Sequence, residues 1–146
     1  MNGVEIKINY ASFEKLINFY NNNNTIFYPP LDSQVQSIED YVRKLENNAT
    51  IFEAWIDTEL VGLVAIYLNN YKNKTGFITS VIVSLKNQKQ GIANKLLNET
   101  IKYAHEKEFL KINLEVHKEN SSAINLYKKL GFKEKQNDFI SLELDI

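Results

Sequence analysis

The chain has 146 residues, 44% hydrophobic and 24% charged, which is typical of one soluble domain large enough to bury a core. It contains no cysteine, which excludes disulfide bonds, thiolate zinc sites and a cysteine nucleophile. Seventeen basic and eighteen acidic residues give a formal net charge of −1. Because neither sign forms a long run, the chain lacks the electrostatic pattern of a protein that binds nucleic acid or an anionic membrane.

The N-terminal quarter predicts a strand, a helix and an irregular loop. Apolar and charged residues alternate over Val4–Ile8, which indicates a strand with one covered face. Ser12 then precedes apolar residues at helical spacing over 13–20, and we expect this helix to stop at the asparagines 21–24. The aromatic segment 27–31 contains two prolines, which disfavour both a helix and a central strand.

The next segments predict a helix followed by a β-hairpin. Ser37 starts a weak capping box for a helix whose apolar residues lie over 38–45. Two β-rich runs, 51–56 and 61–68, are close enough in sequence to pair as a hairpin. The polar segment 69–75 is expected to be a loop.

The second half of the chain alternates strands and helices. A helix of about four turns is expected from Ile92, and another over 121–130, where Gly131 supplies a left-handed C-terminal residue. Strands are predicted over 77–83, 110–116, 132–135 and 139–144. This alternation predicts an α/β fold, a mixed sheet covered by helices on both faces, in a single domain spanning residues 1–146.

Several kinds of partner are not expected. No stretch of about 18 apolar residues occurs, and residues 1–10 hold no continuous apolar block, so we expect a cytoplasmic protein without a membrane partner. The two histidines, His105 and His117, have no second set of ligands at suitable spacing, so no metal site is predicted.

One loop has the composition of an anion site. Between the strand ending at Val83 and the helix starting at Ile92, the chain reads Gln-Lys-Gln-Gly-Ile-Ala over 88–93. The first turn of a helix leaves backbone N–H groups unpaired at the positive end of the helix dipole. The small residues Gly91 and Ala93 would let a diphosphate approach these groups closely.

A second motif lies downstream. From Asn120 to Phe132 the sequence follows the arrangement N-x-x-A-x-x-L-Y-x-x-x-G-F. Together with the 88–93 loop and the strand before it, this motif resembles the GNAT superfamily of N-acetyltransferases, from about Thr50 to Phe132. The resemblance implies a mostly antiparallel central sheet of six to seven strands, splayed into a V between the fourth and fifth strands.

The resemblance also implies that acetyl-CoA is the co-substrate and lies in the V. Its pantetheine arm would pair with the backbone near Ile82 and Val83, and Asn120 would hold it through the side-chain amide; an ordinary helix N-cap is the alternative role of Asn120. The residues expected to bind the coenzyme are Ile82, Val83, Gln88, Lys89, Gln90, Gly91, Ile92, Ala93, Asn94, Asn120 and Tyr127.

Two residues are catalytic candidates. Tyr127 matches the general acid of the family, which protonates the departing thiolate, although it would also pack a helix face. Several family members place a glutamate base at the position of Phe77, and no carboxylate occurs on this strand here. Glu115 is the remaining candidate for the base, if its strand turns odd-numbered side chains toward the V; an ordered water or direct binding of the neutral amine is the alternative.

The sequence indicates less about the acceptor amine than about the coenzyme. Phe27, Tyr28 and Tyr67 are expected to form an aromatic wall for a small-molecule amine, with an amino sugar as one candidate, although aromatic residues also pack ordinary cores. Two other functions stay open, namely acetylation of a protein N-terminus or lysine, and a non-catalytic CoA-binding module. Many members of the family are homodimers, and the sequence shows no interface of its own.

Overall fold

The computed structural model describes residues 3–27, 29–135 and 140–146, and the strands within them form one seven-stranded sheet. The strands are β1 (Val4–Ile8), β2 (Thr50–Ile56), β3 (Glu59–Asn70), β4 (Thr75–Val83), β5 (Lys111–Val116), β6 (Lys133–Lys135) and β7 (Ile140–Asp145). The helices are α1 (Phe13–Asn22), α2 (Leu31–Gln34), α3 (Ile38–Asn48), α4 (Ile92–Glu106) and α5 (Ser121–Lys129), with short 3-10 turns η1 (Asn24–Ile26) and η2 (Leu85–Asn87). Within the described ranges no helix has the length and apolar character that a membrane span needs.

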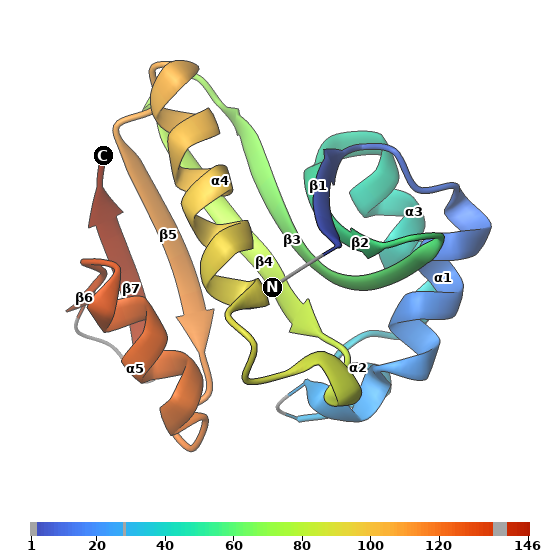
Figure 1. The fold of residues 1–146 in the computed structure, drawn as a ribbon. Coiled ribbons are helices and arrows are strands. Elements are labelled where there is room, and N and C mark those ends of the chain that lie inside the picture. Colours follow the sequence, from blue (N-terminus) through green and yellow to red (C-terminus); the bar gives the residue numbers. More distant parts are fainter. Residues whose placement is uncertain (1–2, 28, 136–139) are drawn as a thin grey trace.

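The sheet opens between its fourth and fifth strands. Its order is β1-β2-β3-β4-β5-β7-β6, and β4 and β5 are parallel neighbours while the other described pairs are antiparallel. The pairing of β4 with β5 runs only from Thr75 opposite Lys111 to Ile78 opposite Leu114. Beyond that point the two strands diverge, as Figure 1 shows. This confirms the predicted mixed, mostly antiparallel sheet with a V between the fourth and fifth strands.

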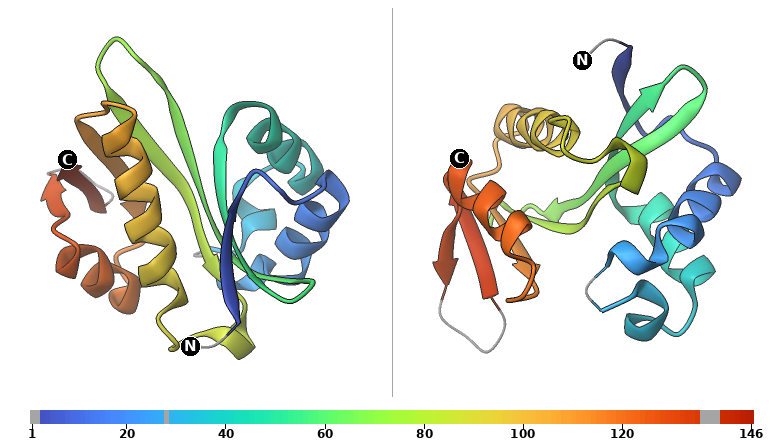
Figure 2. Two further views of the ribbon diagram at one scale, coloured as in Figure 1. Left: turned by 45° about the horizontal axis from the view of Figure 1, so that its top comes forward. Right: turned by 60° about the horizontal axis from the view of Figure 1, so that its bottom comes forward.

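Helices cover both faces of the sheet, as predicted, but unequally. Residues of α4 and α5 pack with β2, β3, β4, β5 and β7 in one hydrophobic core. Residues of α1, α2 and α3 form a second core with β2, β3 and β4, and no residue of β5, β6 or β7 belongs to it. Figure 2 shows α1–α3 gathered on one side of the molecule, away from β6 and β7. The described parts of β5, β7 and β6 therefore lack a helical cover on the α1–α3 side.

The predicted caps are confirmed. The hydroxyl of Ser12 accepts the backbone N–H of Lys15 at 3.1 Å, and the hydroxyl of Ser37 accepts that of Asp40 at 3.1 Å. Gly131 follows α5 with φ of 102°, the left-handed conformation that only glycine adopts without strain. Short-range hydrogen bonds thus decide where these helices begin and end.

α1 ends at Asn22, within the asparagines 21–24 at which a stop was predicted, and the side-chain amide of Asn23 donates to the carbonyl of Phe19 at 2.8 Å. Other predicted boundaries were wrong. Segment 69–75 is not all loop, since β3 extends to Asn70 and β4 starts at Thr75. A short helix, α2, begins at Leu31 directly after Pro30, where the missing proline N–H is not needed. Residue 139, the predicted start of the last strand, lies outside the described residues.

A buried carboxylate ties the connection between β1 and α1 to β2. Glu53 is fully buried and accepts the backbone N–H groups of Tyr10 at 3.2 Å and Ala11 at 3.0 Å, and the indole N–H of Trp55 at 2.9 Å. Burial raises the pKa of Glu53, and these hydrogen bonds and the charge of Lys7 act in the opposite direction. Glu53 therefore fixes the entrance of α1 on the sheet.

Candidate active site

A cavity of about 620 Å³ lies where β4 leaves β5. Its walls come from the end of β4, the connection to α4, the first turns of α4 and α5, and η1. Its lining residues are Thr25, Ile26, Val81, Val83, Leu85, Asn87, Gln88, Lys89, Gly91, Ile92, Ala93, Asn94, Asn120, Ser122, Ala123, Leu126 and Tyr127. The cavity thus combines a helix start, a strand edge without a neighbour and a buried tyrosine.

The start of α4 presents backbone donors to this cavity. Gly91 is the N-cap with φ of 82°, and no side chain makes a cap hydrogen bond there. Lys89 is also left-handed, with φ of 64°. A Cβ atom placed at Gly91 would meet nothing within 4 Å, so an anion can come close to the backbone. Unpaired N–H groups at the positive end of a helix favour a phosphate group at this position.

Most residues expected to bind the coenzyme line the cavity, but Ile82 and Gln90 do not. The side chain of Ile82 is buried in the α1–α3 core. Its carbonyl oxygen faces β3, lying 3.1 Å from the point where a Cβ would stand on Gly62. Because backbone groups alternate in direction along a strand, Val81 and Val83 turn theirs toward the V, and both line the cavity.

The open edge of β4 has one hydrogen bond already. The side-chain amide of Gln88 donates to the carbonyl of Val83 at 3.0 Å. A pantetheine amide that paired with this carbonyl would take the place of the Gln88 side chain, which also lines the cavity. The Val83 carbonyl on this edge can therefore accept a hydrogen bond from a group that lies in the V.

Asn120 and Tyr127 lie on α5. The side-chain oxygen of Asn120 accepts the N–H of Ala123 at 3.4 Å as the N-cap, which leaves its amide nitrogen as the group that a coenzyme would meet. Tyr127 packs on Phe132 with ring centroids 5.8 Å apart and is only 6% exposed. Burial raises the pKa of Tyr127 far above its ordinary value of 10.0, so the phenol keeps its proton at neutral pH.

Sequence reasoning missed several cavity residues that carry no motif. Thr25 and Ile26 come from η1, and they reach the cavity only because the α1–α3 region packs on β4. Leu85 comes from η2, directly after β4, and is 72% exposed. An exposed leucine after a buried strand was its one local hint.

Of the predicted aromatic wall, the two described residues, Phe27 and Tyr67, do not line this cavity. Phe27 packs against Tyr20 with ring centroids 6.0 Å apart, in the α1–α3 core. Tyr67 packs against the same core and has Lys44 Nζ 6.0 Å from its ring centroid. Burial, with a smaller contribution from the neighbouring Tyr41, raises the pKa of Tyr67. Tyr28 lies outside the described residues.

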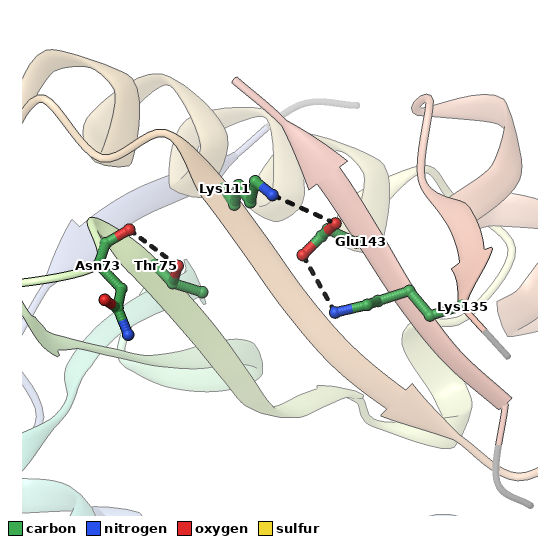
Figure 3. Close-up of polar contacts among 5 residues, drawn as sticks. All are labelled: Asn73, Thr75, Lys111, Lys135 and Glu143. Carbon is green, nitrogen blue, oxygen red and sulfur yellow. Dashed lines mark hydrogen bonds and ion pairs between the residues drawn. The ribbon is translucent and has the colours of Figure 1, made fainter. Parts of the chain in front are cut away.

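Glu115 lies one residue beyond Leu114, the last position of β5 that pairs with β4. The even residues Ile112, Leu114 and Val116 are buried in the α4–α5 core, so Glu115 faces the opposite side and is exposed. On that side of the sheet Glu143 of β7 is held by Lys111 at 3.8 Å and Lys135 at 3.3 Å, as Figure 3 shows. Glu115 is thus separated from the coenzyme cavity by the plane of the sheet, at the mouth of the V.

Known proteins share this architecture. A model of the acetyltransferase (GNAT) family matches residues 13–132. Streptothricin acetyltransferase from Escherichia coli is 36% identical over 87 residues, 60% of this chain and 49% of that protein. An N-alpha-acetyltransferase from Sulfurisphaera tokodaii is 37% identical over 99 residues, 61% of this chain and 59% of that protein. The chain therefore spans about half to three fifths of the length of these two relatives.

Two further matches cover more of the chain. Spermidine N(1)-acetyltransferase from Vibrio cholerae is 31% identical over 127 residues, 82% of this chain and 73% of that protein. The crystal structure of PaiA N-acetyltransferase from Thermoplasma acidophilum in complex with coenzyme A superposes with a TM-score of 0.74. That match covers 97% of this chain and 99% of the other at 21% identity, so it shows a shared fold.

Proposed function

Because the chain belongs to the acetyltransferase (GNAT) family, we propose that it transfers the acetyl group of acetyl-CoA to a primary amine. One observation carries the proposal: the uncapped start of α4, the open edge of β4 and Tyr127 all face one cavity of about 620 Å³. When bound, acetyl-CoA supplies an activated thioester whose carbonyl carbon an amine can attack.

The residues of the cavity suit the parts of this co-substrate. The amides of Ile92, Ala93 and Asn94 would bind the diphosphate, whose charge the helix dipole favours. The backbone of Val81 and Val83 would pair with the pantetheine arm like an added strand. Asn120 would donate its amide N–H to a pantetheine carbonyl while its oxygen caps α5.

The transfer step needs one proton donor and one proton acceptor. The lone pair of the neutral amine attacks the thioester carbon, an amide C–N bond forms and the C–S bond breaks. Tyr127 would donate its proton to the departing sulfur, and the amine would release a proton to Glu115 or to an ordered water. The products are an acetamide and the free CoA thiol, and the proton lost by the amine restores Tyr127 through solvent.

We infer a small-molecule amine as the acceptor. The names of the streptothricin and spermidine relatives support this class, whereas the N-alpha-acetyltransferase relative supports acetylation of a protein N-terminus as the alternative. A non-catalytic CoA-binding module is the remaining alternative, and an amino sugar stays a candidate acceptor.

Purified protein should bind acetyl-CoA in calorimetry and release free CoA thiol when mixed with a panel of amines, amino sugars and peptides. Thiol release with small amines supports the proposal. Peptides turned over far better would favour the N-terminal alternative, and binding without any turnover would favour the non-catalytic module. The absence of both coenzyme binding and turnover would refute the proposed function.

The role of Glu115 has its own test. Glu115→Gln should lower kcat/KM about tenfold and flatten its acid limb if this carboxylate takes the proton. Glu119→Gln, an exposed charge loss four residues further on, is the matched control. Activity within twofold of the wild type would assign the proton to a water instead.

A further inference from the structure

β4 carries an extra residue at the point where it leaves β5. Ile78 pairs with Ile66 of β3, but Ser80 pairs with Ala65, so Thr79 is an additional residue in the ladder. Successive side chains of a regular strand point to opposite faces, and a bulge breaks this alternation. Thr79 and Ser80 accordingly both reach the same partner on the α1–α3 side.

That partner is Tyr41 of α3. Its hydroxyl lies 2.8 Å from the hydroxyl of Ser80 and 3.1 Å from that of Thr79. Ser80 is buried, whereas Thr79 is half-buried. Since a tyrosine hydroxyl has one proton, it donates to one of these oxygens and accepts from the other. Tyr41 therefore orients Thr79 through uncharged hydroxyl groups. Thr79 lies just beyond the last residue of β4 that pairs with β5, the point called here the fork of the V.

The charges around the fork do not make a site for a polycation. β4 has no acidic residue over 75–83, and Glu143 is shared by Lys111 and Lys135. Lys44 adds a positive charge beside Tyr67 on the α3 side. Among the described residues of this face, the register places Lys111, Lys133 and Lys135 beside Glu115, Glu143 and Asp145. With Lys44 added, these described residues leave no net negative charge to hold an acceptor with several ammonium groups.

An amine must be neutral to attack, and this requirement separates two classes of acceptor. An α-amino group with a pKa near 8 is neutral on the order of 10² times more often at pH 7 than an alkylamine with a pKa near 10.4. A carboxylate also takes a proton more readily from the less basic amine. Without a dense anionic site to hold a strongly basic ammonium and deprotonate it, the site depends on acceptors that lose their proton easily.

We propose that the acceptor is a weakly basic primary amine, of the kind flanked by a carbonyl or by ring hydroxyls, and that it is received by Thr79, which Tyr41 holds in place. This inference rests on the proposed acetyl transfer and names its substrate class. The same chemistry occurs in the α-amino group of an amino acid or peptide and in the amine of an amino sugar. Lysine side chains and polyamines are poor acceptors in this view.

The first test compares acceptors. At pH 7, alaninamide or glucosamine should exceed Nα-acetyl-lysinamide and spermidine in kcat/KM by roughly 100-fold, following the neutral fraction of each amine. The pH at which kcat/KM levels off should move with the pKa of the acceptor used. Alaninamide and glucosamine distinguish the peptide-like source from the sugar source.

The second test addresses the residues. Thr79→Val should lower kcat/KM for the better acceptor roughly tenfold and leave coenzyme affinity unchanged, and Thr79→Ser should restore activity. Thr75→Val is the matched control, because it makes the same change on the same strand where the hydroxyl donates to the Asn73 carbonyl at 3.1 Å (Figure 3). Tyr41→Phe should lower kcat/KM, and combined with Thr79→Val it should add nothing, as expected for a positioning residue that acts through Thr79.

The results of these tests distinguish the proposed acceptor class and the role of Thr79 from the proposed acetyl transfer. Turnover with spermidine or the lysine analogue equal to or above that with alaninamide and glucosamine would overturn the acceptor class and leave the acetyl transfer standing. Equal losses for Thr75→Val and Thr79→Val would remove the role of Thr79. Absence of coenzyme binding together with absence of turnover would overturn both proposals.

Discussion

The two sides of the V would recognise the proposed coenzyme and acceptor by different means. On the coenzyme side, the start of α4 and the edge of β4 offer mainly backbone groups, and the few side chains that matter come from one helix, α5. On the acceptor side, Tyr41, Thr79 and Glu115 come from α3, β4 and β5 and offer side chains. Backbone recognition tolerates changes of side chain, whereas recognition by side chains depends on which residues stand at these positions.

This difference has a consequence for substitutions. Changes on the coenzyme side should alter binding of acetyl-CoA or the transfer step for every acceptor alike. Changes on the acceptor side should alter the ranking of amines, or the stability of the scaffold that carries them, and leave coenzyme affinity as it is. Three variants test whether substitutions on the two sides have these different effects.

Gly91→Glu should have the largest effect. A carboxylate at the start of α4 would stand against the diphosphate, and like charges in contact cost several kcal/mol, so the Kd for acetyl-CoA should rise at least about 100-fold in calorimetry. The fold should survive, because a Cβ at Gly91 meets nothing within 4 Å. Gly91→Ala is the control: it has the same left-handed strain, about 1 kcal/mol, without the charge. Wild-type affinity in Gly91→Glu would contradict the assignment of this helix start.

Tyr127→Phe should lower kcat about 100-fold, the usual contribution of a general acid, for every acceptor. The Kd for acetyl-CoA should change little, because the ring still packs on Phe132. Since burial raises the pKa of Tyr127 above 10.0, its ionisation should not reduce activity up to pH 10. Tyr103→Phe, on α4, controls for loss of a phenol elsewhere. An unchanged kcat would remove Tyr127 from the transfer step.

Glu53→Ala tests the scaffold of the acceptor side. It leaves three donors, the N–H groups of Tyr10, Ala11 and Trp55, without their acceptor, and should lower the free energy of unfolding by about 2 kcal/mol. Coenzyme affinity, measured well below Tm, should not change. A large loss of affinity would show that the two sides are not independent.

Glu53 also predicts a pH dependence. Burial raises its pKa above the ordinary 4.5, so between these values the folded chain holds a proton that the unfolded chain has released. Its contribution to stability therefore falls as the pH rises through this window. Compared with Glu53→Gln, the wild type should lose stability between pH 4 and pH 7 in urea unfolding. A gain over the same range would contradict the raised pKa.

Much of the fold was predictable because its patterns are local. Ser12 and Ser37 cap helices through hydrogen bonds that span three residues, and alternating apolar residues mark β1, while continuous apolar runs mark β2 and β3. The errors concerned short elements and exact ends. Pro30 disfavours a helix within segment 27–31, yet α2 begins just after it, where the missing proline N–H is not needed. β3 and β4 also extend into the segment 69–75 that was predicted as a loop.

The candidate site divides in the same way. Nine of the eleven predicted coenzyme residues line the cavity, because a helix start and the motif from Asn120 are short-range features. Ile82 does not line the cavity, because its side chain lies in the α1–α3 core, whereas Val81 and Val83 on either side of it do line it. Thr25 and Ile26 escaped notice because they approach the cavity only through tertiary packing, and Leu85 escaped notice because it carries no motif.

The order of residues alone was enough to predict the helix caps, the family resemblance, the glycine at the start of α4 and the tyrosine on α5. These depend on interactions between residues close in sequence, whose geometry the peptide bond and hydrogen bonding restrict. The opening between β4 and β5, the bulge and the contact of Tyr41 with Thr79 were decided by the tertiary structure, because each requires strands and helices distant in sequence to meet in one register.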